Sequence, residues 1–359
     1  MRQEGEIRKL LTEIQESEDY EFQFDDLAID KAYYLSENEK SSIGIKVLTV
    51  FGGLLASLFF LAFIGITGIY DSGIGSVTLG VLFIVVAIWI CKSSDRLIID
   101  TICISFFAAG FILFGLGLDR LGVADSLTSV ACIFFALMCL FVTQNYILSF
   151  VSVLIMSMGF ISLILLNNSF NFLHLYISAF SIIMTFWFIE EPKLLTSGKV
   201  LARLYDPIRI GLIFSFIGGL ILLGVKGIVT ISPNFQFWIS SIVIVAASMF
   251  VISRLLKLLK LMPGRQTILI YVLSSLLLSF TVMSPSISGS MLIVLLCFMV
   301  NYKTGFAIGL ISFLYFVSQF YFDLNFTLLT KSYMLLGTGL LFLIIYFFTY
   351  KKLQSDEKV

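Results

Sequence analysis

The stretch YILSFVSVLIMSMGFISLILL, residues 146–166, contains no charged side chain, and after NNSFN a second such stretch, FLHLYISAFSIIMTFWFI, occupies residues 172–189. A helix needs about 20 mostly apolar residues to cross roughly 30 Å of hydrocarbon. In lipid the backbone must satisfy its own hydrogen bonds, which favours helices; the strands of a membrane β-barrel would instead alternate every second residue. The pair therefore predicts two membrane-spanning helices joined by a short polar turn.

The same pattern recurs along the whole chain. Hydrophobic residues make up 59% of the 359 residues and charged residues 13%, whereas soluble proteins carry roughly 45–50% and about 25%. This composition excludes a soluble fold, whose surface has to meet water. We predict an all-α polytopic transmembrane bundle of about twelve spans, at residues 47–70, 76–91, 98–118, 124–142, 146–166, 172–189, 208–225, 236–253, 267–283, 287–301, 304–322 and 329–349.

The basic residues predict how these spans are oriented. If there are twelve, 20 of the 23 Lys and Arg residues fall on one side, and only Arg120, Lys226 and Lys331 fall on the other. Basic residues near span ends are retained in the cytoplasm. The split predicts a multi-pass protein of the cell inner (cytoplasmic) membrane with its N- and C-termini both in the cytoplasm.

Polar segments divide the chain into five parts. Residues 1–46 form an acidic cytoplasmic segment, in which Ile7, Leu10, Leu11 and Ile14 have the spacing of an amphipathic helix. This helix is either a docking element or a loosely ordered cap on the first span. The first membrane half follows at 47–189, a cytoplasmic linker at 190–207, the second half at 208–349 and a cytoplasmic tail at 350–359. The division into two sets of six spans reflects either a repeat of two halves, as in many transporters, or only the fact that one loop has to be the longest.

Several chemistries lack the residues that they need. The five cysteines lie in or beside apolar runs without a C-x-x-C pair, and His174 is the one histidine. No phosphate-binding loop, zinc-protease motif or nucleophile elbow is present, and no basic tract suggests nucleic acid. The sequence predicts no cofactor, no metal site and no catalytic residue. Proton-coupled pumps carry ionisable side chains along their path, whereas the centres of the predicted spans are neutral, which disfavours proton coupling. A sodium site built from backbone carbonyls is still compatible with the sequence.

Three turns on the predicted outer side supply candidate binding residues. Residues 115–126, GLGLDRLGVADS, and residues 284–290, SPSISGS, occupy corresponding positions in the two halves. Interrupted helices at matching positions are typical of transporter sites, although both segments also suit ordinary solvated turns. The third turn, residues 321–332, follows a cluster of aromatic residues that suits either a headgroup-level belt or a ligand platform. The candidate binding residues are Asp119, Arg120, Ser284, Ser286 and Asp323.

The C-terminal third resembles a family of bacterial inner-membrane proteins defined by a domain of unknown function. The resemblance is carried by an aromatic-rich helix end, a short leucine-bearing segment with Lys-Ser and a glycine-bearing last span: Phe320, Tyr321, Phe322, Leu324, Leu328, Leu329, Lys331, Ser332, Gly337 and Gly339. Residues 51–63, FGGLLASLFFLAF, are similar to the first span of that family. The resemblance implies a small membrane-anchored protein as a partner, beside the lipid bilayer itself, and supplies no activity.

Three functions are compatible with these observations. The first is a transporter-like protein, or one that handles lipids or small molecules, with a site reached from the outer side between the halves. The alternative is a non-catalytic membrane scaffold that assembles with the small membrane-anchored partner. An intramembrane enzyme is the least favoured, because the residues that such chemistry requires are missing.

Overall fold

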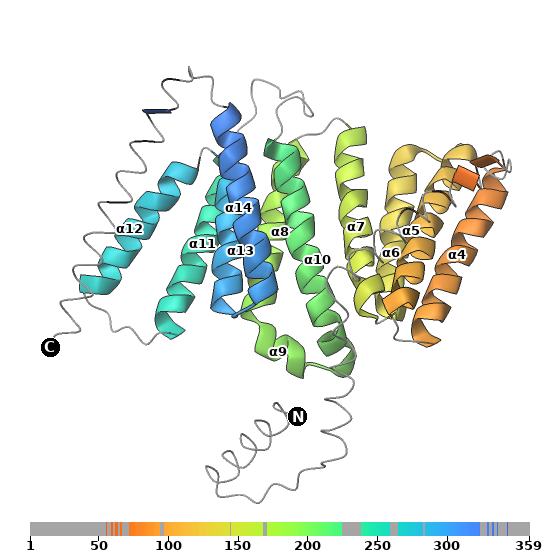
Figure 1. Ribbon diagram of the computed structural model, residues 1–359, viewed down its shortest axis with the longest axis horizontal. Coiled ribbons are helices and arrows are strands. Elements are labelled where there is room, and N and C mark those ends of the chain that lie inside the picture. The colour runs from red at the N-terminus through yellow and green to blue at the C-terminus, as the bar shows by residue number, and fades with distance from the viewer. Residues whose placement is uncertain are drawn as a thin grey trace, which may run out of the picture. The chain divides into compact units, whose positions relative to one another are not determined.

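The computed structural model describes residues 72–93, 97–143, 145–167, 171–224, 238–258, 265–282 and 284–323, together with scattered single residues on either side. All elements in these ranges are helices (Figure 1). In chain order they are α4 (Gly73–Ser93), α5 (Leu97–Arg120), α6 (Asp125–Thr143), α7 (Tyr146–Leu166), α8 (Asn171–Ile189), α9 (Glu191–Thr196), α10 (Lys199–Gly224), α11 (Trp238–Leu258), α12 (Arg265–Thr281), α13 (Pro285–Met299) and α14 (Lys303–Asp323).

Eight helices in the described ranges are long and apolar enough to cross a membrane: α4 to α8, α10, α11 and α14. The all-helical fold and its membrane character are thereby confirmed. Ten predicted spans coincide with α4 to α8 and α10 to α14, but α12 and α13 are short, with 17 and 15 residues. The spans at 47–70 and 329–349, like residues 1–46 and 350–359, lie outside the continuously described ranges. The total of twelve therefore stays a prediction.

The predicted linker at 190–207 contains helical structure. Residues 191–196 form α9, and α10 begins at Lys199, well before the predicted span edge at 208. The reason is an apolar stripe, Leu201, Leu204, Tyr205 and Ile208, whose spacing suits one face of a helix. Leu204 and Tyr205 are fully buried, so packing extends the helix through a region whose charges indicate a loop.

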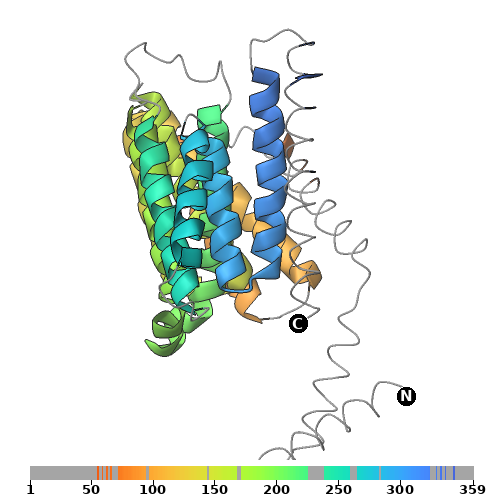
Figure 2. The same cartoon turned by 90° about the vertical axis from the view of Figure 1, so that its left-hand side faces the viewer.

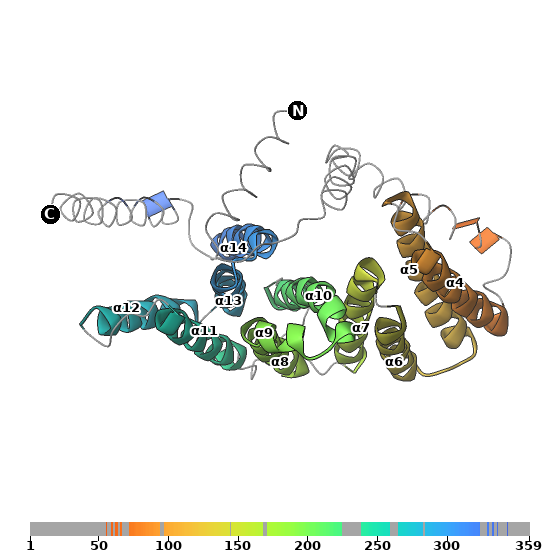
Figure 3. The same ribbon diagram turned by 90° about the horizontal axis from the view of Figure 1, so that it is seen from below.

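Helices α4 and α5 pack through glycines. A Cβ atom added to Gly80 would lie 2.7 Å from the backbone nitrogen of Phe114 and 2.8 Å from the carbonyl oxygen of Gly110. Seven residues after Gly110 on α5, a Cβ atom added to Gly117 would lie 2.6 Å from the backbone nitrogen of Val77 on α4. Small residues allow such close backbone approach between membrane helices. α6 then packs on α7, and α7 on α10 (Figure 3).

Among the described residues, the largest core lies where α8, α10, α11, α13 and α14 meet. α13 is central to it: α10 and α11 pack against this helix, and α14 packs on the side away from α11 (Figure 2). Its members from the first four helices include Ile177, Phe216, Ile244 and Ile293, all fully buried. Serine hydroxyls add hydrogen bonds between helices, for example Ser129 to Ser162 (3.1 Å, α6 to α7). Such bonds are typical of helix interfaces in lipid.

Candidate functional site

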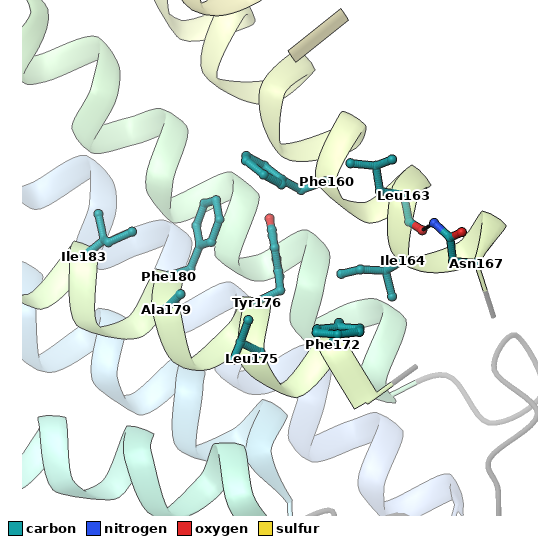
Figure 4. Close-up of a pocket in the computed structure, with 10 residues that line it drawn as sticks. All are labelled: Phe160, Leu163, Ile164, Asn167, Phe172, Leu175, Tyr176, Ala179, Phe180 and Ile183. Carbon is teal, nitrogen blue, oxygen red and sulfur yellow. Dashed lines mark hydrogen bonds between the residues drawn. The ribbon is translucent and has the colours of Figure 1, made fainter. Parts of the chain in front are cut away.

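A cavity of about 690 Å³ lies between α7 and α8 (Figure 4). We call it the α7–α8 groove, and it is lined by Phe160, Leu163, Ile164, Asn167, Phe172, Leu175, Tyr176, Ala179, Phe180 and Ile183. All of these except Asn167 and Tyr176 carry hydrocarbon side chains. Phe172, Leu175 and Ile183 are exposed on α8. The groove therefore opens at the surface of two helices that have the length and composition of membrane spans.

The floor of the groove is held by hydrogen bonds among three helices. The Tyr176 hydroxyl on α8 donates to the Ser215 carbonyl oxygen on α10 at 3.1 Å. It lies 2.8 Å from the Ser157 hydroxyl on α7, which then donates to the Tyr176 oxygen. The Tyr176 hydroxyl is therefore hydrogen-bonded within the protein, and the side chain presents mainly its ring to the groove. The Phe180 ring packs beside it, with the two ring centroids 4.3 Å apart.

One end of the groove carries a polar group. Asn167 follows α7 as its C-cap, and its side-chain nitrogen donates to the Leu163 carbonyl oxygen at 2.8 Å. This residue is exposed, and Figure 4 places it at the end of α7, beyond Leu163. The opposite end of the groove, at Ile183, is apolar. The cavity thus combines a long apolar wall with a polar group at one mouth.

Two of the predicted site residues lie at the buried start of α13. The Ser286 hydroxyl donates to the Leu220 carbonyl oxygen on α10 at 3.0 Å. The Ser284 backbone carbonyl accepts from the amides of the first turn of α13, at 3.1 Å from Ile287. A Cβ atom added to Gly224 would lie 3.2 Å from the Ser286 hydroxyl oxygen and 3.3 Å from the Gln319 side-chain oxygen. These residues form a polar junction of α10, α13 and α14, which we call the serine junction.

The other three candidates lie at helix ends. Asp119 and Arg120 are exposed in the last turn of α5, which packs against α4, α6 and α7. The serine junction belongs to other helices, so the structure assigns the two predicted turns to separate groups of helices. Asp323 ends α14, one turn beyond Gln319 of the serine junction. The structure thus brings Ser284 and Ser286 together, with Asp323 on a helix that contributes to the same junction.

A buried arginine was not among the residues predicted from the sequence. The Arg209 side chain bonds Asp206 at 2.6 Å and approaches Glu191 of α9 at 3.5 Å. Its guanidinium carbon lies 3.8 Å from the centroid of the Tyr302 ring and 5.0 Å from that of Tyr205. Only the pair Asp206 and Arg209, three residues apart, signals this cluster in the sequence. Because both carboxylates already neutralise the cation, the cluster is suited to holding α9, α10 and the α13–α14 connection together.

In the part of the chain that the structure describes, no group of three or more His, Cys, Asp or Glu residues has the arrangement of a metal site. The cysteines in these ranges are free thiols. Two features among the described residues gather groups that could hold a ligand, the α7–α8 groove and the serine junction. Of these, the groove has measurable room for a ligand.

A family model described as a domain of unknown function (DUF4401) matches residues 43–352. No curated protein and no solved structure matches the chain. The matched range includes all the helices described above, so the groove and the serine junction both lie within the matched domain.

Proposed function

The chain belongs to the family defined by the domain of unknown function DUF4401, and from that premise we propose that it is a lipid-handling membrane protein whose α7–α8 groove binds an acyl chain. The observation that carries this proposal is the groove itself: about 690 Å³, with hydrocarbon walls, on two helices of membrane-span composition. Small-molecule sites have volumes of roughly 300–1,000 Å³ and mostly apolar walls. An acyl chain suits such a lining because it needs no hydrogen bond along its length.

Binding in this groove depends on packing and on one polar end. An acyl chain that moves from the bilayer into the groove leaves an environment that is already apolar, so the hydrophobic effect contributes little. What remains is dispersion contact with the aromatic walls, Phe160, Phe172 and Phe180, and interaction of the polar part of the lipid near Asn167. A lipid is therefore favoured over a pure hydrocarbon.

The ligand would enter from the side predicted to face away from the cytoplasm. In the predicted topology the turn after α7, which contains Asn167, lies opposite the side that carries 20 of the 23 Lys and Arg residues. Asn167 would then lie at the level of the outer headgroups of the inner membrane. The Phe172 ring beside it suits that interface.

The proposal is tested with a phospholipid that carries a photoactivatable diazirine in the middle of one acyl chain. The full-length protein in membranes is irradiated with this probe, and the adducts are mapped by peptide mass spectrometry. We expect adducts concentrated on groove residues such as Leu163 and Ala179, and few on Phe186, which is exposed on α8 outside the groove.

Two results would count against lipid binding. Adducts spread evenly over the exposed residues of α7 and α8 would indicate ordinary bilayer contact. A groove that cross-links instead to a co-purified small membrane protein would favour the alternative function, a scaffold whose partner helix occupies the groove.

A further inference from the structure

We infer that Tyr176 determines which chains the groove accepts, and that its ring makes the site selective for an acyl chain without a polar group in its middle. This inference rests on the proposed function. It concerns a single side chain that separates the apolar groove from buried polar atoms behind it. Figure 4 shows the Tyr176 ring among the lining residues, between α8 and the helices behind.

The ring cannot retreat from the groove. A Cβ atom added to Gly219 on α10 would lie 2.7 Å from the Cε1 atom of Tyr176 and 3.1 Å from its Cδ1 atom. The backbone of α10 therefore packs directly against the ring from behind. The hydroxyl is fixed at the same time by Ser157 from α7 and by the Ser215 carbonyl from α10. Tyr176 is 6% exposed, so its position is set by three helices rather than by solvent.

The atoms at the far end of the ring are polar and buried. Ser157 and Ser215 are 4% and 2% exposed. The Ser215 hydroxyl oxygen has no hydrogen-bond partner among the described residues, while the carbonyl of the same residue accepts from Tyr176. Without the ring, the groove would reach a hydroxyl with unused capacity. With the ring in place, a ligand meets an aromatic face at this depth.

This arrangement decides the chemical class of the ligand. In the bilayer, a chain can bend so that a hydroxyl in its middle reaches the polar interface. Against the Tyr176 ring the same hydroxyl has no partner and loses its hydrogen bonds, which disfavours its binding. The groove of the natural protein therefore rejects a chain with a hydroxyl at the depth of Tyr176. Removing the ring would expose Ser157 and Ser215 as partners for that hydroxyl.

The test is competition against the diazirine lipid by two probes, stearate and 12-hydroxystearate, on the full-length protein in lipid nanodiscs. For the natural protein we expect stearate to compete at least about tenfold better. In Tyr176→Ala, stearate and 12-hydroxystearate should compete about equally well, or 12-hydroxystearate should compete better. Tyr176→Phe keeps the ring and should keep the preference, although its unfolding temperature should fall because the hydroxyl bonds are lost.

A matched glycine pair tests the same idea without changing Tyr176. Gly219→Ala places a methyl group against the ring and should push it into the groove, weakening stearate competition severalfold. Gly218→Ala, where an added Cβ atom meets nothing within 4 Å, should leave competition unchanged.

The inference is overturned if both probes compete with the diazirine lipid equally well in the natural protein, or if Tyr176→Ala keeps the full preference for stearate. It is also overturned if Tyr176→Phe and Tyr176→Ala lose the preference equally, since the hydroxyl rather than the ring would then be decisive. Failure of the proposed function gives a different result: neither probe competes with the diazirine lipid in the natural protein.

Discussion

At the scale of single residues, Arg209 shows how side chains that are distant in the sequence stabilise a buried charge. It is 8% exposed although it is charged. Such burial is tolerated because Asp206 and Glu191 supply opposite charge and the Tyr302 ring covers the guanidinium face. The sequence reveals Asp206, three residues away, but Tyr302 lies in the distant connection between α13 and α14, so neither the burial nor the stacking was predictable from local pattern.

Replacing Arg209 should therefore destabilise the protein. Arg209→Gln removes the ion pairs and the stacking, and we expect a loss of about 2 kcal/mol, below the value for fully buried pairs because Asp206 is largely exposed. Arg209→Lys keeps the charge but loses the planar stack and should fall in between. Thermal unfolding in detergent measures both changes.

Arg254 is the matched control for this experiment. It lies 5.4 Å from the Phe250 ring but is exposed, so Arg254→Gln should change stability by no more than about 0.5 kcal/mol. Equal unfolding temperatures for Arg209→Gln and Arg254→Gln would refute the stabilising role of the buried cluster.

At the scale of elements, the close contact between α4 and α5 depends on glycines such as Gly80, where a side chain would meet the backbone of the other helix. The atoms nearest to an added Cβ at Gly80 belong to the backbone of α5 and cannot rotate away. Gly80→Ala should therefore cost about 1–3 kcal/mol, the usual range for overpacking. Gly115→Ala, on α5 with nothing within 4 Å, should be neutral or slightly stabilising. If the two substitutions shift the unfolding temperature alike, the close contact is not formed.

The apolar pattern predicted most of these elements, but not how they pair. Ten helices lie where continuous apolar runs predicted spans, because length and hydrophobicity are local properties. The early start of α10 escaped prediction, since Lys199 and Arg203 suggest a solvated linker while Leu204 and Tyr205 are buried. The α7–α8 groove escaped as well: the spacing of its residues equally suits a well-packed helix pair, and only the position of α10 shows which side stays open.

At the scale of the whole molecule, the resemblance to a domain-of-unknown-function family is confirmed over residues 43–352. The candidate turns were harder to judge from sequence. Their equivalent positions follow from a count of spans, whereas the structure assigns Arg120 and Ser286 to separate groups of helices. Two polar turns of similar appearance thus need not serve one site.

The distribution of basic residues makes a prediction about topology. Ala124→Cys, in the exposed turn between α5 and α6, should react with a membrane-impermeant maleimide added outside intact spheroplasts. Ser197→Cys, in the exposed turn after α9, should react only after the membrane is opened. The unsubstituted protein serves as the blank for the native cysteines. The reverse labelling pattern would invert the predicted orientation.

The most direct test of lipid binding compares two phenylalanine substitutions on α8. Ala179 lines the groove, whereas Ile182 is exposed on the same helix outside it. Ala179→Phe fills the cavity and should reduce cross-linking of the diazirine lipid to Leu163 at least severalfold; Ile182→Phe should leave that adduct at the level of the natural protein. Equal adduct yields at Leu163 in both variants, with both correctly folded, would contradict the proposal that this groove holds an acyl chain.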